Sequence, residues 1–372
     1  MYPIPQKSRA PRNVTRRNFL RLFGIASASL LVTNCGPRSL PIVSLPSPSI
    51  SKTPVAIVRA QTYDRATLEK QLQILIDQLG GLSDVVKPGD SVAIKPNLTG
   101  GVYSGRLSGI SAEESFVTHP EVVRALVKQV QAAGAKEVFI VESVYEWESY
   151  TQWGYEQIAN DLGVKLIDLN DSKPYADFVE TSVGPNSYIY KSFTFNSILK
   201  DIDVFMSVSK MKNHYLAGIT HTLKNLYGLV PYRYYRLNDQ DKYRSAFHGA
   251  DSETRERLPR IIVDINRARP IHFSLIDGVK TIQGGEGPWI SSVATIEPGV
   301  LIAGKNPVAT DAVATAIMGH EPTEDYPNPP FVRCINHLNL AAQAGLGTNR
   351  LDEIEVLGMQ VKDAKIKFAP AP

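Results

Sequence analysis

The chain has very little cysteine: Cys35 and Cys334 are the two among its 372 residues. Two thiols cannot build a disulfide framework, nor supply the four thiolates of a structural zinc site or an iron–sulfur cluster. Hydrophobic residues make up 43% and charged residues 21%, a globular composition that excludes collagen and low-complexity disorder. The length suits about two domains or one large one.

The first 34 residues lack acidic side chains but carry six of the 40 basic ones: Lys7, Arg9, Arg12, Arg16, Arg17 and Arg21. Without this segment the chain has 34 basic and 37 acidic residues, so the basic excess belongs to the leader. The main argument for a nucleic-acid partner disappears with it, and we expect none.

No apolar run of the leader is long enough to span a bilayer, because residues 19–33 are interrupted by Arg21 and fall short of the roughly 20 apolar residues required. A charged segment before a short apolar run predicts a secretory signal over residues 1–34. TRRNFLR (15–21) resembles the twin-arginine signal, which predicts passage through the twin-arginine export machinery. An ordinary secretory signal or an uncleaved anchor is the alternative. The predicted location is the periplasm or the outer face of the cytoplasmic membrane.

Cys35 stands in LLVTNCG, which resembles a lipoprotein cleavage box except that Asn34 replaces the usual small residue. An acyl chain on this thiol would attach the protein to the membrane. The alternative is a cysteine that happens to lie near a conventional cleavage site. Residues 37–54 contain five prolines and five serines, so residues 35–54 are predicted to form a tether, followed by a domain over 55–360 and a tail over 361–372.

Short apolar runs alternate with helical patterns in the domain, which predicts an α/β fold with a mixed, mostly parallel sheet flanked by helices. The predicted strands are 55–59, 91–94, 137–141, 165–167, 204–208, 272–276, 299–303 and 354–357. The predicted helices are 64–79, 120–133, 155–162, 254–267, 307–318 and 331–344. Thr118 and Glu121 have capping-box spacing, Gly134 suits a left-handed helix end, and Asn306 with Pro307 suits a helix start.

Charged residues follow four predicted strands at their carboxyl ends: Lys95, Glu142, Lys210 and Asp277. Ligands of open parallel sheets bind outside these ends. If the four strands are parallel neighbours, the sequence predicts that these side chains converge on one crevice.

The segment 209–231 gathers basic and polar side chains that suit an anion, namely Lys210, Lys212, His214, Thr220, Lys224 and Asn225. A helix over 216–226 would place Thr220 and Lys224 on one face. Ammonium groups beside free backbone N–H groups favour a phosphate or a carboxylate, so the predicted ligand is an anionic small molecule. The alternative is a solvated basic face.

Carboxylates near a bound anion can hold a divalent metal, and Asp277 and Asp311 are the candidates. Asp277 precedes a glycine-rich loop that contains Gly287, where backbone can approach a ligand. The alternative is that Asp277 caps a turn and Asp311 pairs with a lysine. His119 begins a predicted helix, where the dipole disfavours imidazolium; it suits proton transfer or simply caps the turn. Cys334 lies in an apolar context that indicates a buried structural thiol.

Residues 231–260 are rich in tyrosine and mixed in charge, with seven basic and five acidic residues. They are predicted to form a lid or a partner-binding insertion. The alternative is a surface loop packed on its own tyrosines.

These blocks together resemble the prokaryotic family called domain of unknown function 362, in order over about residues 55–358. The matching pieces are VAIKPNL (92–98), THPEVV (118–123), AGAK (133–136), ES (142–143), SKMKNH (209–214), GIT (218–220), LKNLYG (223–228), His248, IDG (276–278), GP (287–288) and GKNPVATDA (304–312). The polar positions carried over are Lys95, Asn97, His119, Glu142, Lys210, Lys212, His214, Lys224, Asn225, Asp277 and Asp311.

Many members of that family carry cysteine-ligated iron–sulfur clusters, and this chain has no such cysteines, so no such cluster is expected from it alone. The family also looks distantly similar to nickel-pincer lactate racemases, which implies two lobes with a site between them. Fold alone does not determine function.

The sequence therefore predicts an exported, membrane-anchored protein that binds an anionic small molecule and acts as a metal-assisted isomerase or hydrolase. Lys95, Asn97 and the lysines of 209–231 would hold the anion, with Thr220, Asn225 and Gly287 beside them. His119 or His214 would transfer a proton, and Glu142, Asp277 and Asp311 would bind a metal or act as base. The alternatives are a non-catalytic binding or assembly protein at the membrane surface and an accessory redox protein.

Overall fold

A computed structural model describes residues 52–175 and 177–372. The predicted signal peptide (1–34), the candidate lipidation site Cys35 and most of the predicted tether lie outside these residues. The first strand, β1 (Thr53–Arg59), includes the last two residues assigned to the tether. No helix in the described part of the chain is long and apolar enough to cross a membrane.

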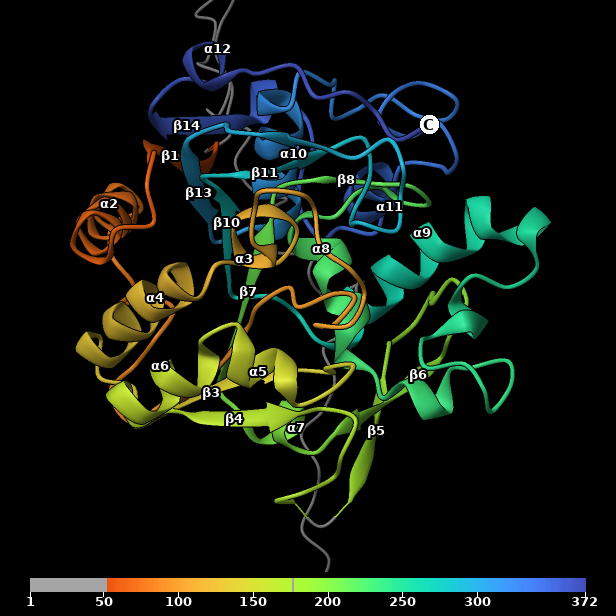
Figure 1. The fold of residues 1–372 in the computed structure, drawn as a ribbon, viewed down its shortest axis with the longest axis horizontal. Coiled ribbons are helices and arrows are strands. Elements are labelled where there is room, and N and C mark those ends of the chain that lie inside the picture. The colour runs from red at the N-terminus through yellow and green to blue at the C-terminus, as the bar shows by residue number, and fades with distance from the viewer. Residues whose placement is uncertain (1–51, 176) are drawn as a thin grey trace, which may run out of the picture. The chain divides into compact units, whose positions relative to one another are not determined.

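One large sheet organises the described chain (Figure 1). Its strands, in spatial order, are β14 (Ile354–Gly358), β1, β13 (Val300–Gly304), β10 (Phe273–Gly278), β7 (Val204–Lys210), β2 (Ser91–Lys95), β3 (Glu137–Glu142) and β4 (Lys165–Asp168). β13 pairs antiparallel with both its neighbours, whereas all the other pairs are parallel. The mixed, mostly parallel sheet is confirmed, and its eight strands are the eight that the sequence predicts.

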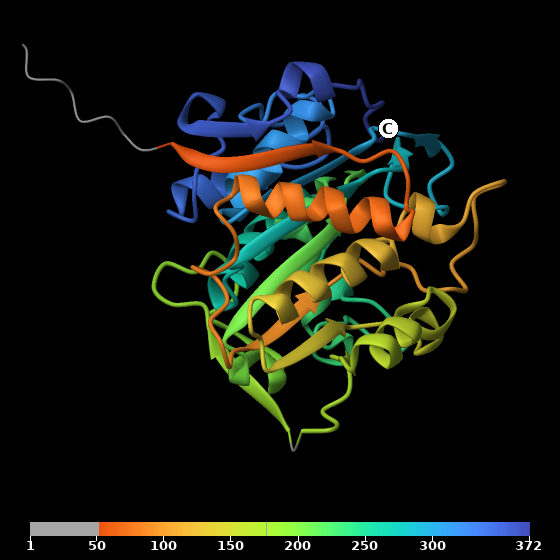
Figure 2. The ribbon, with the colours of Figure 1, turned by 90° about the vertical axis from the view of Figure 1, so that its left-hand side faces the viewer.

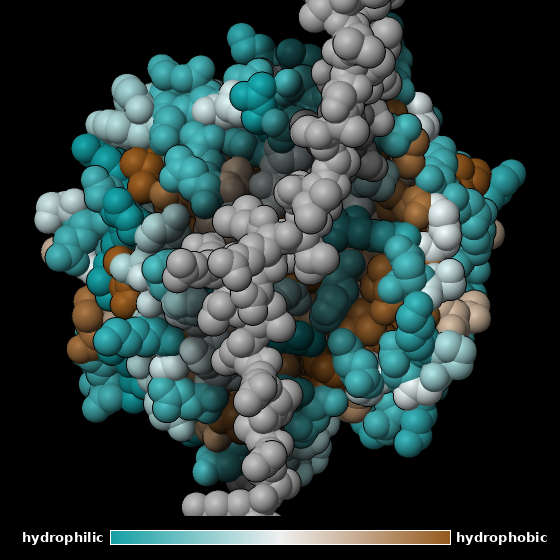
Figure 3. Space-filling view, turned by 180° about the vertical axis from the view of Figure 1, so that it is seen from behind, coloured by the Kyte–Doolittle hydropathy of each residue, from teal (hydrophilic) through white to brown (hydrophobic). Residues whose placement is uncertain are grey.

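Helices cover both faces of the sheet, because alternate strand residues point to opposite sides. Ala56 and Val58 of β1 pack with α2 (Arg65–Gln78), α4 (Pro120–Ala132) and α6 (Tyr155–Leu162), and Figure 2 shows α2 and α4 side by side across this face. Val55 and Ile57 face the other core, with α8 (His221–Asn225), α9 (Asp251–Ala268), α10 (Pro307–Ile317) and α11 (His337–Gln343). On the face shown in Figure 3, hydrophilic residues predominate outside the grey atoms, with hydrophobic patches between them.

The remaining elements are short. The helices are α3 (Ala112–Ser115), α5 (Glu148–Gln152), α7 (Ile198–Asp201) and α12 (Val361–Ala364). The strands form three hairpins that the sequence analysis missed: β5 (Phe178–Ser182) with β6 (Ser192–Asn196), β8 (Asn213–His214) with β9 (Gly218–Ile219), and β11 (Thr281–Gln283) with β12 (Ala294–Ile296). The two-lobe arrangement is not confirmed, since the described elements surround one large sheet.

Several helix boundaries differ from the prediction. The capping box at Thr118 and Glu121 is wrong: His119 is the N-cap of α4, and its Nδ1 accepts from the Glu121 N–H. The Thr118 hydroxyl instead donates to the Val208 carbonyl and accepts from the Asn97 N–H, tying β2 to β7. The cap at Asn306 and the left-handed Gly134 are confirmed.

The helix predicted over 216–226 is wrong for its first half, because the hairpin β8–β9 precedes α8. The helix predicted over 331–344 is also too long, since α11 is capped by Asn336 and begins at His337. The predicted tail packs on the fold, with Phe368 fully buried and its N–H bonded to the Met318 carbonyl.

Residues 231–260 are integrated into the fold. Tyr235 and Phe247 are buried in the core, with ring centres 5.0 Å apart, and both pack on Phe193 and Tyr190. Tyr243, Arg244 and His248 of the same segment line a cavity. The lid or partner-binding role stays a prediction.

Candidate functional site

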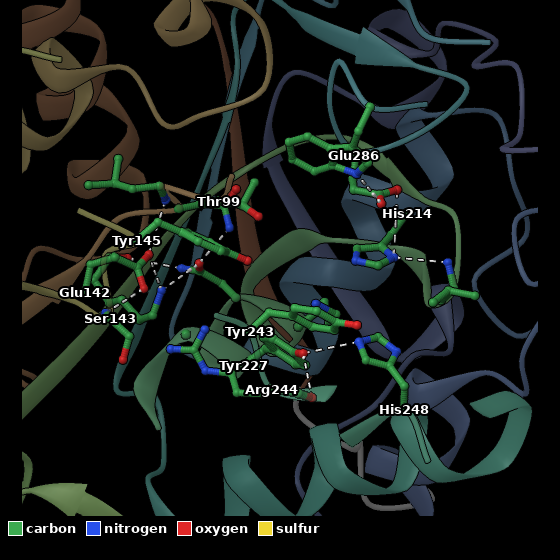
Figure 4. Close-up of a pocket in the computed structure, with 18 residues that line it drawn as sticks. Thr99, Glu142, Ser143, Tyr145, His214, Tyr227, Tyr243, Arg244, His248 and Glu286 are labelled. Atoms are coloured by element: carbon green, nitrogen blue, oxygen red, sulfur yellow. Dashed lines mark hydrogen bonds and ion pairs between the residues drawn. The ribbon is translucent and has the colours of Figure 1, made fainter. Parts of the chain in front are cut away.

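A cavity of about 250 Å³, here called the inner cavity, lies at the carboxyl ends of β2 and β3 (Figure 4). Residues that line it include Lys95, Asn97, Glu142, Tyr145, His214, Lys224, Asn225, Tyr227, Arg244, His248, Glu286 and Trp289. Glu142 lies on one side of it, and His214 and His248 lie on the other. The four strands whose ends carry charged residues are indeed parallel neighbours, in the order β10, β7, β2 and β3.

Lys95 and Glu142 form a buried ion pair in this cavity, with Lys95 Nζ 2.7 Å from Glu142 Oε2. Both carboxylate oxygens are also held by backbone, from the Leu98 N–H to Oε2 and the Ser143 N–H to Oε1. Gly228 covers the pair so closely that a Cβ would lie 2.3 Å from Glu142 Oε1. Burial lowers the Lys95 pKa, and Glu142 opposes that shift. The Lys95–Glu142 pair is therefore a fixed part of the lining of the inner cavity.

Asn225 fixes this pair to α8. Its Oδ1 accepts from Lys95 Nζ at 3.1 Å and from Asn97 Nδ2 at 3.2 Å, while its Nδ2 donates to the Lys95 carbonyl and the Ser207 hydroxyl. All four contacts require one orientation of the amide, so the network sets where α8 lies relative to β2. The adjacent residue, Lys224, is thereby held at the cavity.

Lys224 is 8% exposed, and no hydrogen bond or salt bridge to its ammonium is found among the described residues. Its Nζ lies 4.1 Å from the centre of the Tyr227 ring. Burial lowers the Lys224 pKa to about 7; Glu286 and Glu142 oppose the shift, and Arg244 and Lys95 add to it. The amine is therefore partly neutral at neutral pH, unlike an exposed lysine.

Arg244 is a site residue that the sequence analysis missed. It is 3% exposed, and its Nε donates to the Val230 carbonyl at 2.8 Å. Its Nη2 is buried without a hydrogen-bond partner in the described chain, and its guanidinium lies 5.5 Å from the centre of the same Tyr227 ring. In the sequence, Arg244 is one of seven basic residues of 231–260, and no pattern distinguishes it.

His214 presents a defined tautomer to the cavity. Its Nδ1 accepts from the Leu216 N–H at 3.1 Å, so the proton resides on Nε2, and Figure 4 shows this second nitrogen directed toward the cavity. Burial lowers the His214 pKa to about 3, and Glu286, 4.0 Å away, opposes that shift. Glu286 is in turn held by the Tyr215 N–H and Trp289 Nε1. His214 is a neutral hydrogen-bond donor at neutral pH.

A larger outer cavity of about 720 Å³ adjoins the first and shares Leu216, Tyr243 and His248 with it. At this boundary the Tyr227 hydroxyl donates to the Arg244 carbonyl and lies 3.2 Å from His248 Nε2. Because that hydroxyl proton is already used, His248 Nε2 carries a proton of its own, and burial lowers the His248 pKa to about 4. The two cavities therefore meet at Tyr243 and His248.

Lys210 and Asp277, predicted to join the crevice, instead form a second buried pair opposite one another on β7 and β10. Lys210 Nζ lies 2.9 Å from Asp277 Oδ2 and also donates to Tyr63 Oη and the Glu113 carbonyl. His119 stacks on Tyr63 with ring centres 3.7 Å apart, and burial lowers the His119 pKa to about 4. None of these residues lines the inner cavity.

The other predicted site residues have structural partners. Lys212 Nζ donates to the carbonyls of Phe116 and Glu286. Asp311 of α10 accepts from the N–H groups of Thr222 and Leu223 and so holds the start of α8, where Thr220 is the N-cap. Gly287 leaves no space for a side chain beside Trp289, whose ring a Cβ would approach to 2.3 Å.

Asp277 and Asp311 share no hydrogen-bond partner, and their contacts involve different elements. Among residues 52–175 and 177–372, no group of three or more His, Cys, Asp or Glu side chains is arranged to hold a metal ion. The arrangement therefore gives no support to the predicted divalent metal at these two carboxylates. Cys334 is buried, and burial raises its thiol pKa to about 12, as expected for a structural residue.

Known proteins resemble part of this chain. It is 28% identical over 269 residues to a thylakoid-associated protein of Synechocystis sp., with 72% of this chain and 75% of that protein covered. A crystal structure of a Thermotoga maritima protein aligns with 77% of this chain at 11% identity and a TM-score of 0.32, and the chain spans 60% of that protein. The profile of the family described as domain of unknown function 362 (DUF362) matches residues 92–316, which include β2, β3, α8 and α10. The chain belongs to the DUF362 family.

Proposed function

We propose that the inner cavity binds a small anionic molecule. The observation that carries the proposal is that two buried cationic side chains, Lys224 and Arg244, face this cavity with no carboxylate paired to either among the described residues. A buried guanidinium with an unsatisfied N–H is costly unless a ligand completes it. A carboxylate or phosphate matches the fork of an arginine.

The balance of charge in the cavity supports an anion. Lys95 and Glu142 neutralise one another, and Glu286 is held by Tyr215 and Trp289 on the opposite wall. Three cationic side chains, Lys95, Lys224 and Arg244, thus line the cavity against two carboxylates, Glu142 and Glu286, so the lining has a cationic excess while Lys224 is protonated. A volume of about 250 Å³ is just below the roughly 300–1,000 Å³ of pockets for drug-sized ligands, so the ligand is small.

Proton-transfer chemistry on the bound anion, as in an isomerase or a hydrolase, is the activity that fits this set of residues. His214 offers a neutral N–H, and Lys224 exchanges its proton near neutral pH because its pKa is about 7. General acids and bases work best when their pKa lies near the working pH. Lys224 is therefore the candidate acid–base residue, together with His214 as a donor.

We expect Arg244→Met to weaken anion binding about tenfold or more, because one or two charge-assisted hydrogen bonds are lost. Calorimetric titration of the full chain with inorganic phosphate, lactate and propionate measures this. Lys200→Met is the matched control: Lys200 is exposed on α7 and does not line the cavity, so affinity should not change. If none of the three anions binds, or if Arg244→Met binds them as the wild type does, the proposal is wrong.

We also propose that the protein is exported through the twin-arginine machinery and held at the membrane by a lipid on Cys35. The residues TRRNFLR and LLVTNCG support this, as does the thylakoid-associated relative. We expect Cys35→Ser to move most of the protein from the membrane fraction to the soluble fraction, because acyl chains supply the attachment. Cell fractionation and labelling with radioactive palmitate measure it, with Cys334→Ser as control. Unlabelled wild type, or membrane attachment unchanged in Cys35→Ser, would exclude the lipid anchor.

A further inference from the structure

The buried lysines of the described chain differ in what their amines contact. Lys95, Lys210 and Lys212 each donate to at least two protein oxygens. The acceptors of Lys95 are in Glu142, Asn225 and Pro96, and those of Lys212 are backbone carbonyls. Lys224 donates to none of the described residues and instead lies against the Tyr227 ring at the inner cavity. Its lone pair, when free, is available to a ligand.

We propose that Lys224 forms an imine with a small 2-oxo carboxylate whose carboxylate group is held by Arg244. The inference rests on the proposed anion site and names the class of its ligand. Lys224 and Arg244 both line the inner cavity, and they lie 4.1 Å and 5.5 Å from the centre of the same ring, that of Tyr227. In a 2-oxo carboxylate the carbonyl carbon is bonded directly to the carboxylate carbon, so a ligand small enough for this cavity offers one group to the amine and one to the guanidinium.

The surroundings favour a nucleophilic amine. Lysine is activated when it is desolvated or when it lies beside another cation. Lys224 is buried, and both Arg244 and Lys95 lower its pKa, to about 7. At neutral pH about half of the molecules then carry the free amine, whereas an exposed lysine is almost entirely protonated.

The step balances without an oxidant or a reductant. The Nζ lone pair attacks the carbonyl carbon, a C–N bond forms, and the carbonyl oxygen takes a proton, for which the Nε2–H of His214 faces the cavity. The nitrogen then returns a proton to His214, the hydroxyl gains a proton from solvent and leaves as water, and the nitrogen lone pair closes the C=N bond of a protonated imine. An iminium next to a carboxylate withdraws electrons from the neighbouring carbon, so proton exchange or isomerisation there becomes easier.

Reductive trapping tests the inference. The full chain is incubated with pyruvate and sodium cyanoborohydride, and the adduct is measured by intact mass and located by peptide mapping. We expect one adduct per chain, on Lys224, formed faster as the pH rises from about 6 to 8 and then levelling off, because the free amine reacts. Exposed lysines, which are almost entirely protonated over this range, should react much more slowly.

Lys224→Arg, which keeps the cation but cannot form an imine, should lower trapping at least tenfold, whereas Lys200→Arg should not change it. Mapping of the wild-type adduct keeps the test valid even if Lys224→Arg folds poorly. Lactate carries a hydroxyl in place of the ketone of pyruvate, so it distinguishes imine formation from simple anion binding. If lactate binds and pyruvate leaves no adduct on Lys224, imine formation is wrong and the anion site stands. If neither binds, both are wrong.

Discussion

Acidification to pH 5 and below is expected to unfold this protein, mainly through its buried histidines. All seven histidines lie in the described part of the chain, and burial lowers the pKa of every one of them. His214, His221 and His337 have values of about 3. His337 has no hydrogen-bond partner for either ring nitrogen within the described chain.

The direction of the effect follows from linkage between protonation and folding. Above pH 6.5 a histidine is neutral in both states and has no effect. Below it the unfolded chain takes up a proton that the folded chain resists, so the free energy of unfolding falls as the pH falls, until the folded pKa of about 3 is reached. At about 1.4 kcal/mol per pH unit, each such histidine costs about 2 kcal/mol at pH 5. Three of them sum to about 6 kcal/mol, at the lower end of the roughly 5–15 kcal/mol of a whole protein's stability. Burial raises the Asp311 pKa to about 7, so this carboxyl acts in the opposite direction and offsets about one such histidine.

Far-ultraviolet circular dichroism of the full chain between pH 8 and pH 3 measures this transition. His337→Leu removes one buried imidazole that has no partner to lose, so the midpoint should move to lower pH. His272→Gln is the control, because His272 is only partly buried and should move the midpoint less. A wild type that stays folded at pH 4, or a His337→Leu midpoint that does not move, would contradict this expectation.

Asp277→Asn is expected to destabilise the protein by about 3–5 kcal/mol, because it leaves the Lys210 ammonium buried without its counter-ion. Both side chains of the pair are 0% exposed, and Asp277 also accepts from the Tyr63 hydroxyl and the His119 N–H. An amide cannot accept all of these donors. Chemical denaturation in urea measures the loss.

Two further variants make this experiment specific. Lys210→Met in the Asp277→Asn background removes the unpaired charge and should restore part of the lost stability. Lys165→Met breaks the exposed pair with Glu137 and should change stability little, since solvent screens that pair. If Asp277→Asn instead leaves stability unchanged and removes a bound divalent cation, Asp277 is a metal ligand, as the sequence first indicated.

The sequence predicted the candidate site only in part, and the four charged strand ends show why. Each of Lys95, Glu142, Lys210 and Asp277 was recognised as the charged residue after an apolar run. The structure pairs Lys95 with Glu142 in the cavity and Lys210 with Asp277 outside it. These pairs depend on which strands are adjacent and on their register, and both are long-range properties that local patterns do not contain.

Arg244 shows a second limit. Its role comes from burial next to Tyr227 and from the absence of a partner for Nη2 among the described residues. Neither property is visible in a loop sequence with seven basic residues. Likewise, His119 rather than Thr118 caps α4, because the Thr118 hydroxyl is used by β2 and β7.

The sequence by itself determined the eight strands, the main helices and the family, because apolar periodicity and motif spacing are local and are read along the chain. Residues 1–35 carry the patterns on which the proposed export and lipid anchor rest. The tertiary structure alone decided that Lys224 and Arg244 share a ring and a cavity while Lys210 and Asp277 neutralise each other elsewhere. The net charge of a binding site depends on which buried groups neutralise one another, and that pairing exists only in the folded chain.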